Sequence, residues 1–143
     1  MTTINRIIYL DFDGVLHPTS PVMDGLFSRA HLLEDLFTKM QSEVFIVVSS
    51  SWRFTHNLEK LQRIIPTYIS SLIVVVTGAP VIGKHPRFTE ITNFLKSNVE
   101  IDWKALDDSY WEFPNPCPQL VRCNPNTGIT DKQITEIRQW LSS

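Results

Sequence analysis

Five short apolar runs, set at intervals along the chain, constrain its fold more than any other feature. They are rich in β-branched residues and nearly continuous, and such runs are typical of parallel strands that are buried on both faces. A strand is therefore predicted at each run. The runs lie at 6–10, 44–48, 72–76, 101–106 (the weakest) and 119–123.

Between the runs, apolar residues recur at three- to four-residue spacing, which predicts amphipathic helices. Thr130 and Gln133 predict a capping box at the start of the last helix. Strands that alternate with helices form right-handed βαβ units around one parallel sheet. We therefore expect an α/β, Rossmann-like fold with helices on both faces, formed by residues 1–143 as a single domain. The predicted helices span 28–41, 55–65, 88–97 and 130–142.

The bulk composition excludes several classes of protein. A net charge of −2 over 143 residues argues against a broadly basic surface for nucleic acid. No apolar run reaches the ~18 residues that cross a membrane, and no signal-peptide pattern opens the chain. The two cysteines, Cys117 and Cys123, have neither a disulfide-framework nor a zinc-site spacing. We expect a cytoplasmic protein with no membrane partner, and its oligomeric state stays open.

Two carboxylates follow the first apolar run. Asp11 and Asp13 are spaced i, i+2 and precede Gly14, so an extended backbone would place both side chains on one side. Ligands of open α/β folds bind at the carboxyl edge of the sheet, where this run ends. Clustered carboxylates repel one another unless a cation lies between them, so the pair indicates an Mg²⁺ site.

Other polar residues follow the later runs. Three serines, 49–51, follow the second run, and Asp107 with Asp108 follows the fourth. Lys84 lies ahead of the third predicted helix, and Arg87 is its rival three residues on. Parallel strands bring their carboxyl ends to one edge, so these side chains are expected to converge there. Acids, hydroxyls and a cation are what phosphoryl transfer through an aspartyl-phosphate requires.

Taken together, these motifs resemble a haloacid dehalogenase (HAD) superfamily phosphohydrolase. The closer resemblance is to the HAD domain found in Swiss Army Knife RNA repair proteins. It covers nearly the whole chain, and the first motif is specific in combination with the acid pair. The segments that carry the resemblance are Leu-Asp-Phe-Asp-Gly-Val-Leu-His-Pro at 10–18, Ser-Ser-Ser-Trp-Arg at 49–53, Leu-Asp-Asp at 106–108, Arg87 with Glu90, and Gly-Ile-Thr at 128–130.

The resemblance implies a role for each residue of the first two motifs. Asp11 would be the nucleophile that forms the aspartyl-phosphate. Asp13 would protonate the leaving group and then deprotonate the hydrolytic water, and its backbone carbonyl would bind Mg²⁺. Ser49 would hydrogen-bond the transferring phosphoryl group, with Ser50 as the alternative. Residues 12–27 would form a turn and flap over the site.

The resemblance also implies the metal ligands and the cation. Asp107 and Asp108 would hold Mg²⁺, with Asp108 as the favoured direct ligand and Asp107 bound through water. Lys84 would balance charge between Asp11 and the phosphate, and Arg87 stays its alternative. The implied activity is Mg²⁺-dependent phosphoric monoester hydrolysis.

The segments between the predicted strands are too short for a folded cap domain. An uncovered site can admit a phosphate on a large molecule, so a nucleic-acid end or a nucleotide is one expected substrate. Trp52, Arg53 and Trp111 flank the site loops and are candidates for recognising it by stacking and charge. The alternatives are a small-molecule (sugar or nucleotide) phosphatase and a non-catalytic HAD-like binding module.

Overall fold

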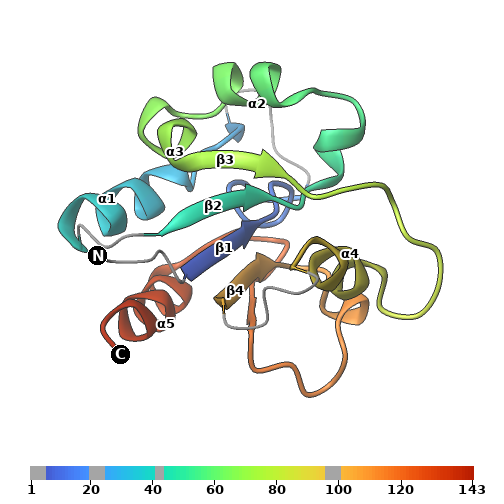
Figure 1. The fold of residues 1–143 in the computed structure, drawn as a ribbon. Helices are drawn as coiled ribbons and strands as arrows, with labels where there is room; N and C mark the ends of the chain where they lie inside the picture. Colours follow the sequence, from blue (N-terminus) through green and yellow to red (C-terminus); the bar gives the residue numbers. More distant parts are fainter. Residues whose placement is uncertain (1–5, 20–24, 41–43, 96–100) are drawn as a thin grey trace, which may run out of the picture.

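The computed structural model describes residues 6–19, 25–40, 44–95 and 101–143. Within them, one five-stranded sheet has the order β3-β2-β1-β4-β5, and every neighbouring pair is parallel (Figure 1). This confirms the predicted α/β class, and each strand lies within two residues of its expected bounds. The strands are β1 (Arg6–Leu10), β2 (Phe45–Val48), β3 (Ile73–Val76), β4 (Asp102–Asp107) and β5 (Leu120–Arg122).

The described ranges also contain five α-helices and two 3₁₀ helices. The sequence predicted four of the α-helices but not α3, because a six-residue helix after Pro66 is too short to show a period. The capping box at Thr130 and Gln133 is present. The helices are α1 (Ala30–Met40), η2 (Ser51–Phe54), α2 (Leu58–Ile64), α3 (Thr67–Leu72), α4 (Pro86–Leu95), η3 (Tyr110–Glu112) and α5 (Asp131–Leu141).

Alternate residues of each strand supply two apolar layers. Ile8 and Leu10 of β1 face the larger layer, which α1, α2, α3 and α5 cover (Figure 1). Tyr9 points to the opposite layer, where it packs with Ile91 and Leu95 of α4. Helices therefore cover both faces, as predicted, and the near-continuous apolar runs reflect burial on both sides.

The connections are short, and none within the described ranges forms a separate cap domain over the carboxyl edge of the sheet. No helix there is long and apolar enough to cross a membrane. Cys117 and Cys123 are both free thiols, as their spacing predicted.

Arg53, in η2, is buried and bonded inside the protein. Its Nε donates to the Gly78 carbonyl at 3.1 Å, and Nη1 donates to the carbonyls of Ser49 and Ser50 at 2.7 and 3.0 Å. Its Nη2 pairs with the buried Glu90 carboxylate of α4. These bonds fasten the end of β2 to the segment after β3 and to α4. This placement corrects the expected role of Arg53 at a substrate phosphate, because its three nitrogens already serve the fold.

We expect Arg53→Ala to lower the free energy of unfolding by about 3–5 kcal/mol, because it leaves the Glu90 carboxylate buried without its partner. Denaturant unfolding measures this loss. Arg63→Ala is the matched control, because Arg63 pairs with Glu59 at an exposed i, i+4 position and should lose less than about 1 kcal/mol. Equal losses in the two variants would contradict a structural role for Arg53.

Candidate active site

The hydrogen-bond ladder of the sheet continues one residue past the ends of the central strands. The Asp11 N–H donates to the Leu106 carbonyl at 3.1 Å, and the Ser49 N–H donates to the Leu10 carbonyl at 3.0 Å. Asp11 therefore lies between Ser49 on one side and Asp107 on the other. β1 and β4 are also the neighbours at which the winding direction reverses, the point where open α/β sheets bind ligands.

Three carboxylates gather at this edge. Oxygen atoms of Asp11, Asp107 and Asp108 lie within 4.8 Å of one another, as the sequence predicted. Asp11 is 6% exposed and Asp107 is 1% exposed, whereas Asp108 is half-buried. Burial, together with the charge of Asp107, raises the pKa of Asp11 well above its usual range. Burial likewise raises the pKa of Asp107, although Arg87 opposes the shift.

Arg87 of α4, not Lys84, is the cation among these acids. Its Nη1 lies 3.0 Å from Asp107 Oδ2 and 3.6 Å from Asp11 Oδ1. Lys84 is exposed on the segment between β3 and α4 and does not line the cleft that contains the acids. Helix α4 holds Arg87 against the sheet, whereas Lys84 lies on an exposed loop. The structure therefore favours Arg87, the alternative to Lys84 that the sequence left open.

The donor set fits Mg²⁺, a cation that prefers oxygen ligands. Asp107 Oδ1 accepts the Ser109 N–H at 2.9 Å, while Asp107 Oδ2 accepts from Arg87. Each Asp107 oxygen thus has one hydrogen bond and keeps only part of its capacity to bind a cation. Direct coordination of the metal by Asp108 stays a prediction.

Asp13 is not part of the carboxylate cluster. Its Oδ1 lies 2.8 Å from His17 Nε2, and its Oδ2 accepts the indole N–H of Trp52 at 3.1 Å. Trp52 is half-buried and packs against Phe12 and His56. The structure thus places Trp52 beside Asp13 and not in the lining of the cleft, where stacking on a substrate base would require it.

The three serines after β2 have different surroundings. Ser49 Oγ is buried and has no hydrogen-bond partner among the described residues, so it keeps the capacity to donate to a phosphate. Ser50 Oγ accepts the Trp52 N–H at 3.2 Å and caps η2. Ser51 is exposed and lines the cleft. The sequence selected Ser49 and Ser50 as candidates for binding the phosphoryl group. The exposure of Ser51 to the cleft follows from the backbone turn into η2, which the sequence alone did not predict.

A cleft of about 540 Å³ opens above the acids. Trp111 is 63% exposed and lies in its lining, and its expected role in substrate recognition stays a prediction. Of the predicted flap at 12–27, residues 20–24 lie outside the described ranges, while Thr19 lines the cleft. The lining consists of Asp11, Asp13, Thr19, Ser51, Phe54, Pro80, Val81, Pro86, Arg87, Glu90, Asp108, Ser109, Trp111 and Glu112.

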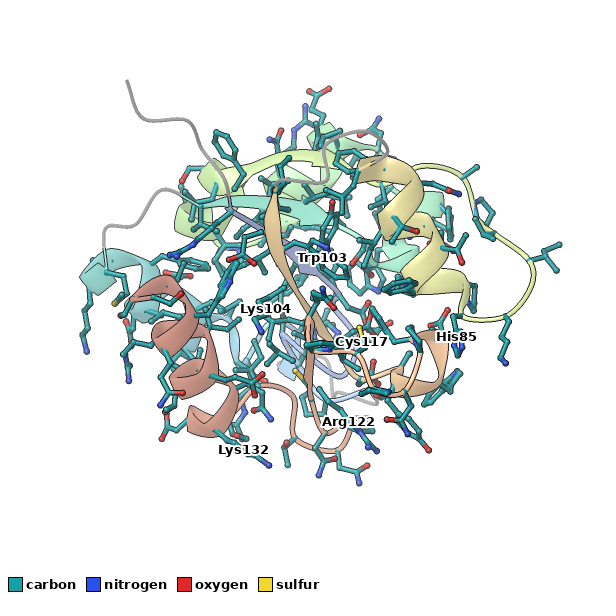
Figure 2. The ribbon with its side chains drawn as sticks, turned by 60° about the horizontal axis from the view of Figure 1, so that its bottom comes forward. His85, Trp103, Lys104, Cys117, Arg122 and Lys132 are labelled. Carbon is teal, nitrogen blue, oxygen red and sulfur yellow. The ribbon has the colours of Figure 1, made fainter. Side chains whose placement is uncertain are left out.

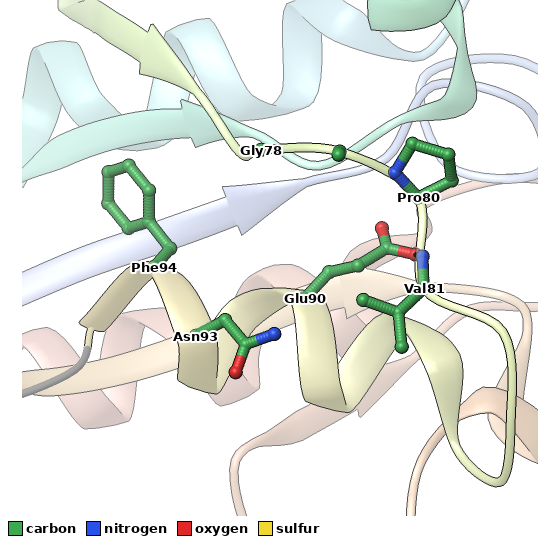
Figure 3. A pocket seen from close by; sticks show the side chains of 7 residues that line it. Gly78, Pro80, Val81, Glu90, Asn93 and Phe94 are labelled. Carbon is green, nitrogen blue, oxygen red and sulfur yellow. Dashed lines mark hydrogen bonds between the residues drawn. The ribbon is translucent and has the colours of Figure 1, made fainter.

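A second cavity of about 470 Å³ adjoins the cleft. The two share Pro80, Val81 and Glu90, and Figure 3 shows the Glu90 side chain extending from α4 toward the strand-following segment. Glu90 Oε2 also accepts the Val81 N–H at 3.3 Å. Glu90 therefore stands in the wall between the cavities and holds the segment after β3 against α4.

Gly14 permits the close approach of the first motif to Asp108. Its φ of +76° lies in the left-handed region, and a Cβ at this position would lie 2.5 Å from the Asp108 carboxyl carbon. Any side chain here would push the Asp108 carboxylate away from Asp11. The glycine of the sequence motif is thus required by the position of Asp108 as well as by the turn.

Residues 7–134 match the family model described as the HAD domain in Swiss Army Knife RNA repair proteins. The match covers most of the chain, so the chain belongs to this family. Neither the curated proteins nor the solved structures gave a match.

We expect Mg²⁺ to raise the melting temperature of the wild type and Gly14→Ala to abolish this rise, because the added methyl would displace Asp108. Thermal unfolding with and without millimolar Mg²⁺ measures this. Gly83→Ala is the matched control: its φ is also positive, but nothing lies within 4 Å of the added Cβ. If both variants kept the full Mg²⁺ response, Asp108 would not be a metal ligand.

We expect Mg²⁺ to stabilise the protein more at about pH 8 than at about pH 5. Folding raises the pKa of Asp11 and Asp107, so the folded metal-free protein holds their protons more tightly than the unfolded chain does. The stabilisation that this tighter proton binding gives is complete when the pH is below the ordinary pKa range of carboxyl groups. It is lost as the pH rises through the raised pKa values of the folded protein. Mg²⁺ binds the deprotonated acids and offsets this loss. A Mg²⁺ effect on melting temperature that is independent of pH would contradict the cluster as its site.

Proposed function

We propose that this member of the HAD-domain family is a Mg²⁺-dependent phosphomonoesterase that acts through an aspartyl-phosphate. One observation carries the proposal: Asp11 lies at the base of an open cleft, beside the guanidinium of Arg87 and within reach of Asp108. This arrangement combines a fixed nucleophile with positive charge for the phosphoryl oxygens. Mg²⁺ held by Asp11 and Asp108 would neutralise further charge on the transferring group.

In the first step, an Asp11 carboxylate oxygen bonds to phosphorus, and the phosphorus–oxygen bond to the leaving group breaks. Asp13 supplies the proton to the departing oxygen. In the second step, water attacks the phosphorus of the aspartyl-phosphate, Asp13 takes up a proton from that water, and inorganic phosphate leaves Asp11 free. Arg87 lies where it can compensate negative charge in both steps, and the Ser49 and Ser51 hydroxyls are candidate donors to the phosphoryl oxygens.

Asp11→Asn should abolish turnover of a phosphate ester, because it removes the nucleophile. Asp13→Asn should lower kcat by about 10²–10⁴-fold, because it removes proton transfer but leaves Asp11 in place. Steady-state kinetics with Mg²⁺ and with excess chelator measure both effects, and chelator should abolish wild-type activity. Near-normal rates for Asp11→Asn would exclude the covalent mechanism, and an inactive wild type that still binds phosphate would favour the binding-module alternative.

We further propose a phosphorylated nucleic-acid end as the substrate. The family description concerns RNA repair proteins, and the cleft is open enough for a polymer end. Exposed Trp111 at the cleft could stack on a terminal base. Next to it, the Arg122 guanidinium lies 3.8 Å from the Tyr110 ring centroid. Figure 2 shows Arg122 and Lys132 on one side of the molecule, where they offer local positive charge despite the net charge of −2.

Trp111→Ala should lower kcat/KM for a phosphorylated oligonucleotide by about tenfold, because one base-stacking contact of about 1–3 kcal/mol is lost. It should leave kcat/KM for a small aryl phosphate unchanged, and that substrate is the control within each variant. The comparison should include mononucleotides and sugar phosphates. If the wild type hydrolysed all of these equally well, and Trp111→Ala changed none of the rates, the protein would be a small-molecule phosphatase.

A further inference from the structure

The Asp13 carboxylate is held by two neutral N–H donors, one on each oxygen. His17 Nε2 lies 2.8 Å from Oδ1, and the Trp52 Nε1–H donates to Oδ2 at 3.1 Å. The Asp13 side chain is 45% exposed, whereas that of His17 is fully buried. The half-exposed Asp13 side chain, which lines the open cleft, is thus held by the buried His17 ring and the half-buried Trp52 indole.

We propose that His17 and Trp52 are positioning residues that aim the Asp13 carboxylate at the leaving group during phosphoryl transfer. The inference rests on the proposed function, since it concerns the proton donor of that reaction. A carboxyl oxygen has two lone pairs, so an oxygen that accepts one hydrogen bond can still carry or receive the transferred proton. The two donors therefore fix the direction of Asp13 without blocking its chemistry.

The backbone of Phe27 determines which nitrogen of His17 carries the proton. The Phe27 N–H donates to His17 Nδ1 at 3.1 Å, so Nδ1 must be an acceptor. In a neutral ring the proton then lies on Nε2, which donates to Asp13. Phe27 has a φ of +58°, an unfavourable conformation for an aromatic residue. That strained backbone presents its N–H to His17, and a strained residue is typical of positions with a functional constraint.

Packing fixes the Trp52 indole before any substrate arrives. Its ring centroid lies 5.4 Å from that of Phe12, 5.7 Å from that of Phe27 and 5.5 Å from that of His56, on which it stacks. Its backbone N–H is bonded to Ser50 Oγ at the start of η2. A donor whose own position is fixed in this way can hold a catalytic group within the narrow range that proton transfer needs.

Trp52→Phe tests the inference, because it removes the N–H donor and keeps an aromatic ring in the cluster. Trp140→Phe is the matched control: the Trp140 indole also donates to an aspartate, Asp102, at 2.8 Å, but from α5 to β4. Each variant should be assayed on an alkyl phosphate and on p-nitrophenyl phosphate. The first leaving group needs a proton, whereas p-nitrophenolate departs readily without one.

We expect Trp52→Phe to lower kcat for the alkyl ester by about tenfold and kcat for p-nitrophenyl phosphate by less than about twofold. KM should change little for either ester. Trp140→Phe should reduce both rates equally or not at all. His17→Gln, which keeps an N–H donor near the position of Nε2, should lose less alkyl-ester activity than His17→Leu. A Trp52→Phe variant that lowers both rates by the same factor would overturn the positioning role.

NMR spectroscopy supplies a readout that does not depend on activity. The ¹⁵N signals of His17 should show the neutral tautomer with its proton on Nε2, and the Trp52 indole N–H resonance should shift in Asp13→Asn while that of Trp140 does not. A proton on Nδ1, or an unmoved Trp52 resonance, would overturn the inference. A wild type that hydrolyses no ester would refute the proposed function, whereas an active enzyme indifferent to Trp52→Phe would refute only the positioning role.

Discussion

Buried carboxylates repel one another, and this fold brings three of them within 4.8 Å at the carboxyl edge of its sheet. The cost of that approach shapes the rest of the site. Burial, together with neighbouring carboxylates, raises the pKa of Asp11 and Asp107, and Arg87 is the buried cation placed against both. Gly14 leaves the space that Asp108 occupies. A divalent cation would complete the compensation that one guanidinium provides only in part.

The compensating charges also connect the site to the fold. Arg87 Nε lies 3.9 Å from Glu90 Oε1, and Glu90 in turn pairs with Arg53. Arg53 bonds to the carbonyls at the end of β2 and after β3. The charges therefore alternate in sign from Asp11 to the backbone carbonyls at the sheet edge. Because each member is buried, removing one leaves a neighbour without its partner, so this row couples the stability of the fold to the geometry of the proposed active site.

The sequence predicted the strands, most helices and the close approach of Asp11 to Asp107 and Asp108. Strand order and the parallel-sheet rule decide which residues share an edge of the sheet, so this approach follows from the pattern of strands.

The sequence could not decide whether Lys84 or Arg87 is the cation near these acids. A signal was present: Arg87, Glu90 and Ile91 fall on one helical face, and the structure buries that face. Arg53 and Trp52 were harder to interpret, because only the turn of η2 after β2 sends the arginine inward and the indole toward Asp13.

Asp11 and Asp13 are two residues apart, yet the fold gives them opposite environments. Asp11 lies in a cluster of buried charges beside an arginine, and this environment suits the proposed nucleophile. Asp13 faces the cleft, and among the described residues its carboxylate is hydrogen-bonded by the rings of His17 and Trp52. A cation in their place would pair with the carboxylate and hold it as the anion, whereas an N–H group sets its direction and leaves it able to exchange a proton. The difference between the two surroundings is what would let one short motif supply both a nucleophile and a proton carrier.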